Sequence, residues 1–210
     1  IVTRQVAVAD TGQDIEQAVR EALGRADLVI TTGGLGPTSD DLTRDLVAQL
    51  LGKKLHEDAA ALTNIEGFFV ARKRPVLESV KVQALVPDGA IVLQNAHGTA
   101  PGLAMELSPN PFRAGGKAAW LVMLPGPPRE LRPMFSEQVV PLLQRALPLE
   151  REFVCRTLRT TGIGESLVQE KIVGPLAALV AQGLEVGYCA HVGQVDVRLA
   201  AHGTSAAELV

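Results

Sequence analysis

The sequence predicts an α/β fold with a mostly parallel sheet, followed by a small α+β unit. Two observations support this. Up to residue 149, short apolar strand segments alternate with segments of helical periodicity, and 27–32 is almost continuously apolar, as expected for a strand covered on both faces. Near Pro148 the pattern changes to one strand, one helix and a hairpin. We therefore expect two domains, 1–149 and 150–210.

The first domain is expected to begin with a strand over 1–9, where valines alternate with other residues. A helix follows over 15–24, where apolar residues recur at helical spacing, and then the strand over 27–32. The next helix, over 40–51, opens with acidic residues and ends before Gly52, a suitable C-cap. This order of elements implies parallel strands joined by right-handed crossovers.

Helices are next expected over 57–72, which carries an apolar stripe, and over 81–84. A final helix over 127–147 has prolines in its first turn, where they are tolerated, and a kink or break at Pro141. Prolines and glycines at 108–116 indicate a flexible tip between paired strands. The further strands of this domain are expected at 90–93, 103–107 and 118–124.

The second domain begins with an alternating strand over 152–161. A helix over 164–182 is expected to be interrupted near Pro175, because proline removes a hydrogen bond from a helix interior. A hairpin over 184–201 completes the unit. The two cysteines, Cys155 and Cys189, have no metal-ligand spacing and are expected to be buried in strands.

The composition is that of an ordinary globular protein, with 47% hydrophobic and 20% charged residues and a net charge of −3. Mild acidity and 3% aromatic residues argue against nucleic-acid binding, which favours basic faces and stacking platforms. No apolar run is long enough to span a membrane, and no signal peptide opens the chain. We therefore expect a cytoplasmic protein without a membrane partner.

A glycine-rich loop between the strand 27–32 and the following helix predicts a phosphate or nucleotide site. Gly33, Gly34 and Gly36 allow close approach of the backbone to a ligand, and their amides can face an anion. Asp40 and Asp41 would repel phosphate alone, but the pair suits a divalent cation that bridges to phosphates.

Alternatives to this interpretation stay open. Ser39 or Asp40 is also a suitable N-cap for the helix that follows. No lysine follows the glycines as in a P-loop, and the spacing is not that of a dinucleotide fingerprint. One acid could cap the helix while the other binds metal.

Three ordered segments resemble the CinA-like (competence/damage-inducible) family, within the molybdopterin-binding superfamily that includes MogA and MoeA. The first is Gly-Gly-Leu-Gly-Pro-Thr-x-Asp-Asp-Leu-Thr at 33–43. The second is Asn-x-x-Gly-Thr-Ala-Pro-Gly at 95–102, and the third is Leu-Pro-Gly-x-Pro-x-Glu at 124–130. A weaker match continues at 162–166. The resemblance implies a MogA-like three-layer αβα sandwich followed by an α+β subdomain.

The match also has departures. The family domain normally opens with a strand, a turn and a helix ahead of the strand that here starts at Ile1, so we expect the first domain to lack these elements. The second domain is expected to be incomplete, because the chain ends at Val210 within a starting helix. Residues 1–210 do not resemble the amidohydrolase domain that many CinA proteins carry, so we do not expect that activity from these residues.

The resemblance implies hydrolysis of ADP-ribose to AMP and ribose 5-phosphate, with Asp40 and Asp41 as catalytic residues that hold Mg, Mn or Co ions. Thr38 and Thr43 could bind phosphate oxygens, but each is equally well interpreted as a local cap. Glu130 could complete the site, but it is equally well interpreted as a favourable negative charge in the first turn of a helix. Homo-oligomers are typical of the family. The expected ligand-binding residues are Gly33, Gly34, Gly36, Thr38, Thr43, Gly98, Thr99, Gly126 and Glu130.

The alternative function is a binding module without catalysis, which would hold a molybdopterin-type or nucleotide ligand in the same pocket. Superfamily members range from adenylyltransferases to scaffolds, and a fold does not determine a function. A third hypothesis, DNA association, is disfavoured by the net charge and the scarcity of aromatic residues. His97 precedes a glycine in the second loop and is a weaker candidate for a catalytic base.

Overall fold

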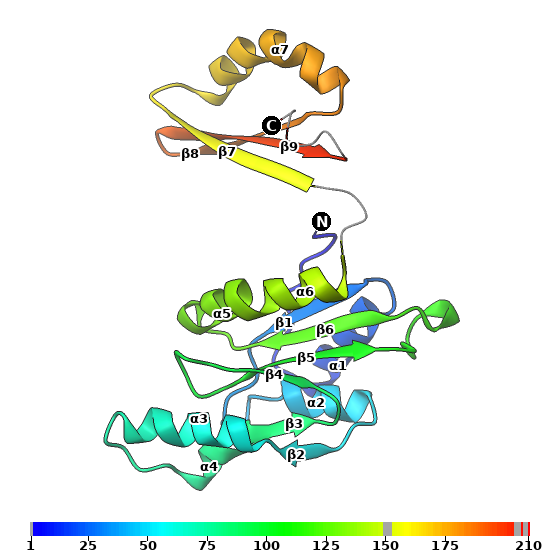
Figure 1. Cartoon of the computed structure of the whole chain (residues 1–210), viewed down its shortest axis with the longest axis vertical. Helices are drawn as coiled ribbons and strands as arrows, with labels where there is room; N and C mark the ends of the chain where they lie inside the picture. Colours follow the sequence, from blue (N-terminus) through cyan, green and yellow to red (C-terminus); the bar gives the residue numbers. More distant parts are fainter. Residues whose placement is uncertain (1, 149–152, 204–206, 208–209) are drawn as a thin grey trace. The chain divides into compact units, whose positions relative to one another are not determined.

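The computed structural model describes residues 2–148, 153–203, 207 and 210 (Figure 1). Its contacts divide the chain into two compact units, Ile1–Leu143 and Gln144–Val210. No helix within the described ranges is both long enough and apolar enough to cross a membrane.

The first unit contains a four-stranded sheet in the order β1-β6-β5-β4. β1 (Leu28–Thr32) and β6 (Ala119–Leu124) are parallel. β5 (Gly102–Leu107) runs antiparallel to β6, and β4 (Ile91–Leu93) runs antiparallel to β5. The predicted α/β class is confirmed, but the sheet is mixed, because β4, β5 and β6 follow one another as a meander without crossover helices.

Helices cover both faces of this sheet and give three layers (Figure 1). α1 (Gly12–Leu23) and α2 (Thr43–Leu50) lie on one face. A composite helix lies on the other, made of α5 (Pro128–Met134), the π-helical segment η3 (Phe135–Val139) and α6 (Val140–Ala146). The core between α1, α2 and the sheet includes Val19, Leu23, Val47, Leu103, Met105, Leu121 and Met123.

The composite helix corresponds to the helix expected over 127–147. The predicted break near Pro141 takes the form of the π turn η3, which ends two residues before that proline. Because Pro141 has no N–H to donate, the regular hydrogen-bond ladder is already disturbed here. Pro128 occupies the first turn, as expected from its missing donor.

A small substructure extends the first unit beyond the sheet. It contains α3 (Ala59–Val70), α4 (Glu78–Lys81) and the 3-10 turn η1 (Val82–Ala84). An antiparallel pair flanks these elements in the chain: β2 (Leu55–Glu57) precedes α3 and β3 (Leu85–Pro87) follows η1. This pair was not predicted from the sequence, because strands of three residues are too short to show an alternating pattern.

The strand expected over 1–9 is not formed by residues 2–9, so that prediction is wrong. β1 is an edge of the described sheet, but residues 2–9 do not pair with it, so this segment buries no face against the sheet. Its valines are consequently exposed; Val2 is 86% exposed and Val6 51%.

The connection between β5 and β6, expected to be a flexible tip, is anchored to the domain. The buried Asn110 donates through Nδ2 to the Leu23 carbonyl at 2.8 Å. Arg113 forms an ion pair with Asp27, at 2.6 Å between Nη1 and Oδ1. The short 3-10 turn η2 (Ala114–Gly116) completes the connection. The proline and glycine content therefore indicates a turn here rather than mobility.

The second unit consists of β7 (Phe153–Thr161), α7 (Glu165–Ala181), β8 (Glu185–His191) and β9 (Gln194–His202). The strands are antiparallel in the order β7-β9-β8, which includes the predicted hairpin. The core on the α7 side of this sheet contains Val168, Val195 and Val197.

Two predictions for this unit are wrong. α7 continues through Pro175 without an interruption. Cys155 and Cys189 lie in strands, as expected, but both are exposed. Cys189 pairs with Asp196, which alternates with the core residues of β9 and so faces the side of the sheet opposite α7.

Candidate functional site

The three segments that carry the sequence motifs meet at one end of the four-stranded sheet. In the parallel pair β1–β6, Thr32 lies beside Leu124, so the loops that follow both strands leave the sheet together. In the antiparallel pairs, the start of β5 lies at the same end, because Leu103 pairs with Met123 and Gly102 with Leu93. The sheet register therefore brings residues 33–43, 94–102 and 125–130 into one region.

Contacts between the backbones join the first and third segments. The Gly33 N–H donates to the Leu124 carbonyl at 2.9 Å and extends the β1–β6 pairing by one residue. A Cβ atom placed on Gly126 would lie 3.5 Å from the Gly33 Cα, which is an ordinary packing distance. The expected role of the Gly33 amide as a phosphate donor is therefore wrong for this structure, because that N–H already has an acceptor.

Gly34 and Thr43 form the base of the glycine-rich loop. Gly34 has a positive φ of 69°, and a Cβ atom there would overlap the Thr43 hydroxyl. The Thr43 N–H donates to the Gly34 carbonyl at 3.1 Å, and Thr43 is buried. Thr43 therefore packs against the loop, but the alternative that it caps the helix is wrong, because the N-cap of α2 is Leu42.

Asp41 folds back onto the loop. Its Oδ2 accepts hydrogen bonds from the Thr38 N–H at 3.0 Å and the Thr38 hydroxyl at 2.5 Å. Partial burial acts to raise the pKa of Asp41, but the bonds from Thr38 and Gly36 and the nearby Arg44 outweigh it, so the pKa lies below its usual value. Thr38 and Asp41 thus close the turn between the glycines and α2.

Asp40 differs from its neighbour. Its side chain is exposed and forms no hydrogen bond with the described residues. The expected N-cap role of Ser39 or Asp40 is wrong, because α2 begins at Thr43 and its N-cap is Leu42, without a side-chain cap. Asp40 therefore leaves its carboxylate open to solvent.

The carboxylates of Asp40 and Asp41 are too few to surround a metal ion by themselves. No group of three or more His, Cys, Asp or Glu residues gathers within the described ranges. Magnesium is commonly held by one or two carboxylates together with substrate phosphates and waters, rather than by a complete protein cage. The donor set of Asp40 and Asp41 fits an ion that arrives with a phosphate ligand.

The second segment is built around buried polar groups. Asn95 donates through Nδ2 to the Ala100 carbonyl and to Glu130 Oε2, both at 2.8 Å. Its Oδ1 accepts from the His97 N–H at 3.0 Å. A Cβ atom on Gly98 would overlap the Glu130 carboxylate, so glycine is required at this position. Glu130 is buried beneath the loop; its Oε2 accepts from Asn95, and its Oε1 lies 3.6 Å from Arg129 Nε.

The remaining predicted residues lie on the outer side of these segments. Thr99 is half-buried and the His97 side chain is exposed, while Gly126 is exposed in the turn after β6. The roles of Asn95 and Gln138 were not predicted from the sequence, although both residues form hydrogen bonds that hold the second segment. Asn95 is the first residue of the motif at 95–102, so its position in the motif could have indicated a role. Gln138 lies in no motif, and the sequence around it gives no such indication.

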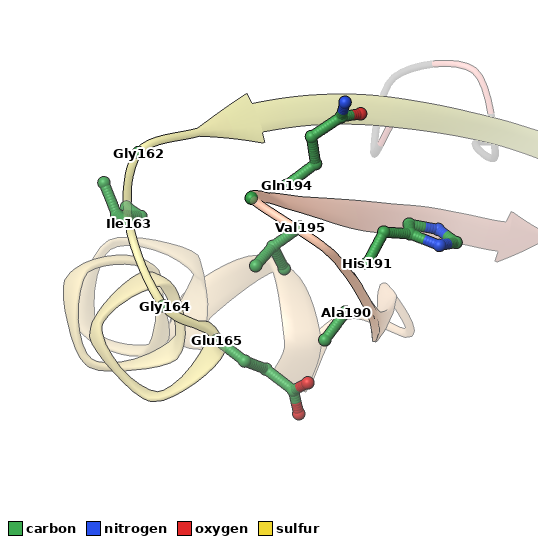
Figure 2. A pocket seen from close by; sticks show the side chains of 9 residues that line it. Gly162, Ile163, Gly164, Glu165, Ala190, His191, Gln194 and Val195 are labelled. Atoms are coloured by element: carbon green, nitrogen blue, oxygen red, sulfur yellow. The ribbon is translucent and has the colours of Figure 1, made fainter.

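The second unit has a separate depression of about 350 Å³ at the turn between β7 and α7. It is lined by the weaker motif at 162–165 and by residues of the β8–β9 turn. In Figure 2 the side chains of Glu165 and Gln194 point in opposite directions. These polar groups do not converge on one point, so we assign no ligand to this depression.

Comparison with known proteins agrees with this architecture. Residues 1–145 match the family described as probable molybdopterin binding domain, and residues 155–209 match the damage-inducible protein CinA KH domain. A CinA-like protein of Akkermansia muciniphila is 45% identical over 93% of this chain and 45% of its own length. A putative competence-damage inducible protein of Geobacillus kaustophilus is 41% identical over 96% of this chain and 46% of its own length.

The chain thus spans about half the length of the curated relatives that it matches. Among solved structures, the protein CinA with unknown function from Thermoplasma acidophilum is 31% identical, with a TM-score of 0.52 over 69% of this chain and 78% of the other. The order of the two matched domains, the motif segments at one end of the sheet and these relatives together establish that the chain belongs to the CinA family.

Proposed function

We propose that the first unit binds a nucleotide diphosphate of the ADP-ribose type and hydrolyses its pyrophosphate bond in the presence of a divalent ion. The observation that carries this proposal is the convergence of the three motif segments at one end of the sheet. In open α/β sheets, ligands bind in crevices outside the carboxyl ends of strands, and both β1 and β6 end here.

The reaction adds one water to ADP-ribose. An oxygen of the water bonds to one phosphorus, the bridging P–O bond breaks, and AMP and ribose 5-phosphate leave. When bound, a Mg, Mn or Co ion would polarise a phosphoryl oxygen and assist deprotonation of the water. Asp40 is the principal ligand for this ion in our proposal, because its carboxylate is solvent-facing, and Asp41 contributes the oxygen that Thr38 does not bind.

The backbone supplies the remaining contacts of the proposed site. In our proposal, the Gly34 amide and the backbone around Gly98 and Thr99 bind phosphate oxygens, whereas the Gly33 amide is already paired with the Leu124 carbonyl. The buried Arg44 is one of the groups that lower the pKa of Asp41, but its guanidinium is paired with Asp45 at 2.9 Å, so in our proposal the divalent ion neutralises the acid pair. A molybdopterin-type phosphate ligand would use the same donors.

A second function, nucleotide binding without catalysis, is favoured by one specific observation. The described residues provide two neighbouring carboxylates, one of them engaged by Thr38, and no third metal-binding side chain close by. A site of this kind can hold a ligand without activating water. Binding and hydrolysis therefore need separate measurements.

The test is to incubate the whole chain with ADP-ribose and Mg, Mn or Co ions and quantify AMP, with ADP-ribose affinity measured in parallel by calorimetry. Asp40→Asn is expected to abolish AMP formation while metal-free affinity stays within about threefold. Asp41→Asn should reduce both AMP formation and the metal-free affinity for ADP-ribose, because it also loosens the loop that Asp41 closes with Thr38. Asp10→Asn, an exposed acid outside the three segments, is the matched control. Binding without AMP from the parent chain would favour the non-catalytic function, and no binding would refute both.

A further inference from the structure

A stripe of three side chains on the composite helix contacts the second motif segment. Glu130, Met134 and Gln138 follow one another at intervals of four residues, so they share one face of α5 and η3. Gln138 forms a double hydrogen bond with the backbone of Gln94. Its Nε2 donates to the Gln94 carbonyl at 2.7 Å, and its Oε1 accepts from the Gln94 N–H at 2.9 Å.

The other two members of the stripe contact later residues of the segment. Glu130 accepts from Asn95 Nδ2, and the same Asn95 amide holds the Ala100 carbonyl. Met134 is buried against Gly102, where a Cβ atom would overlap its sulfur. The helix thus contacts the segment near its beginning, its middle and its end.

These contacts hold the backbone of the segment in place. The two bonds of Gln138 reproduce the pairing that a neighbouring β-strand would give to Gln94, immediately after β4 ends. Asn95 is 2% exposed and Glu130 7%, so neither side chain offers a broad surface to a ligand. Gln138 also lies in a π-helical turn, a feature that occurs frequently at functional sites.

We propose that Gln138 and Glu130 are positioning residues, which together with Met134 fix the segment 94–102 in the conformation that the nucleotide site requires. Glu130 acts through Asn95 and does not itself contact the nucleotide. The part of this inference that concerns the ligand rests on the proposed function, whereas the part that concerns the order of the segment does not.

Amide hydrogen exchange of the whole chain without nucleotide tests the first part. In Gln138→Ala, the Gln94 amide is expected to exchange about tenfold faster, because it loses its acceptor. Gln144→Ala, the same substitution at an exposed position of α6, is the matched control. Amides of β5 should keep their protection in both variants, which separates local loosening from general unfolding. Unchanged exchange at Gln94 would overturn the inference.

Substitutions of Glu130 test whether its role is to accept a hydrogen bond. Glu130→Gln keeps an acceptor for Asn95, so exchange of the His97 amide should stay within about twofold of the parent chain. Glu130→Ala removes the acceptor and should raise that exchange about tenfold. If the glutamine variant loosens the segment as much as the alanine variant, the hydrogen-bond role is wrong.

Calorimetric titration with ADP-ribose tests the second part. Gln138→Ala is expected to weaken binding about fivefold or more, with the affinity retained in Gln144→Ala. A looser segment with unchanged affinity would overturn the positioning role, while leaving the proposed function intact. If the parent chain binds no ADP-ribose, the proposed function fails, and hydrogen exchange alone decides whether the stripe orders the segment.

Discussion

Replacing Gly34 by alanine should destabilise the first unit strongly, because two costs add at this position. The positive φ of 69° is unfavourable for a residue with a Cβ atom, at about 1–2 kcal/mol. The new methyl would overlap the Thr43 hydroxyl and lie 2.9 Å from the Thr43 Cβ, which adds about 1–3 kcal/mol of overpacking. The free energy of unfolding should therefore fall by about 2–5 kcal/mol.

Gly33→Ala provides the matched comparison. Its φ is 93°, also in the left-handed region, but a Cβ atom there would meet nothing within 4 Å. It should carry only the conformational cost of about 1–2 kcal/mol, so the difference between the two variants measures the contact with Thr43. Adding Thr43→Ala to Gly34→Ala removes the overlapping hydroxyl and should recover part of the loss.

Urea unfolding followed by tryptophan fluorescence is the appropriate assay. Trp120 is the single tryptophan and lies in β6, so the signal reports on the first unit. Linear extrapolation then gives the change in unfolding free energy for each variant. If Gly34→Ala costs no more than Gly33→Ala, or if Thr43→Ala recovers nothing, the packing argument for this loop is refuted.

Two further predictions follow from the same unit. The depressed pKa of Asp41 stabilises the fold at pH values above the unfolded pKa of about 3.9, and this contribution is lost as the pH falls through the folded pKa. Thr38→Val removes the hydroxyl donor, so carboxyl NMR titration should show a higher pKa for Asp41; an unchanged titration would contradict the assignment. Asn110→Ala should cost about 2–4 kcal/mol by Trp120 fluorescence, because the Leu23 carbonyl and the Phe112 N–H lose buried partners, and a loss below about 0.5 kcal/mol would contradict the anchored tip.

Sequence periodicity predicted the elements that bury a continuous apolar surface. α1 was found because its apolar residues recur at helical spacing, and Val19 and Leu23 reach the core. β1 was found from a continuous apolar run, although only Val29 of this edge strand is buried, whereas β6 is buried at every position. The segment 1–9 shows the limit of this signal, because it has an alternating pattern although residues 2–9 do not pair with the edge strand β1. The pair β2–β3 and the anchored tip were missed because they depend on contacts between residues distant in sequence, such as Asn110 with Leu23.

The three motif segments of the candidate site were predictable from the sequence, but the contacts of their side chains were less so. The motif segments were expected to meet, and the register of the sheet brings them together. The pattern could not distinguish Asp40 from Asp41, because the two residues are adjacent and identical in type. Only the folded turn shows that one carboxylate binds Thr38 while the other faces solvent.

The glycines of the motifs have a physical explanation that does not require a ligand at most positions. Protein side chains occupy the space that a Cβ atom would take at Gly34, Gly36 and Gly98, namely those of Thr43, Asp41 and Glu130. Gly33 is different, because the space beside it is open and its φ is positive. Substitutions at the first three positions should therefore disturb folding and function together. Gly33 is the glycine of the first loop at which a bulkier side chain would test close approach of a ligand with the least change in packing.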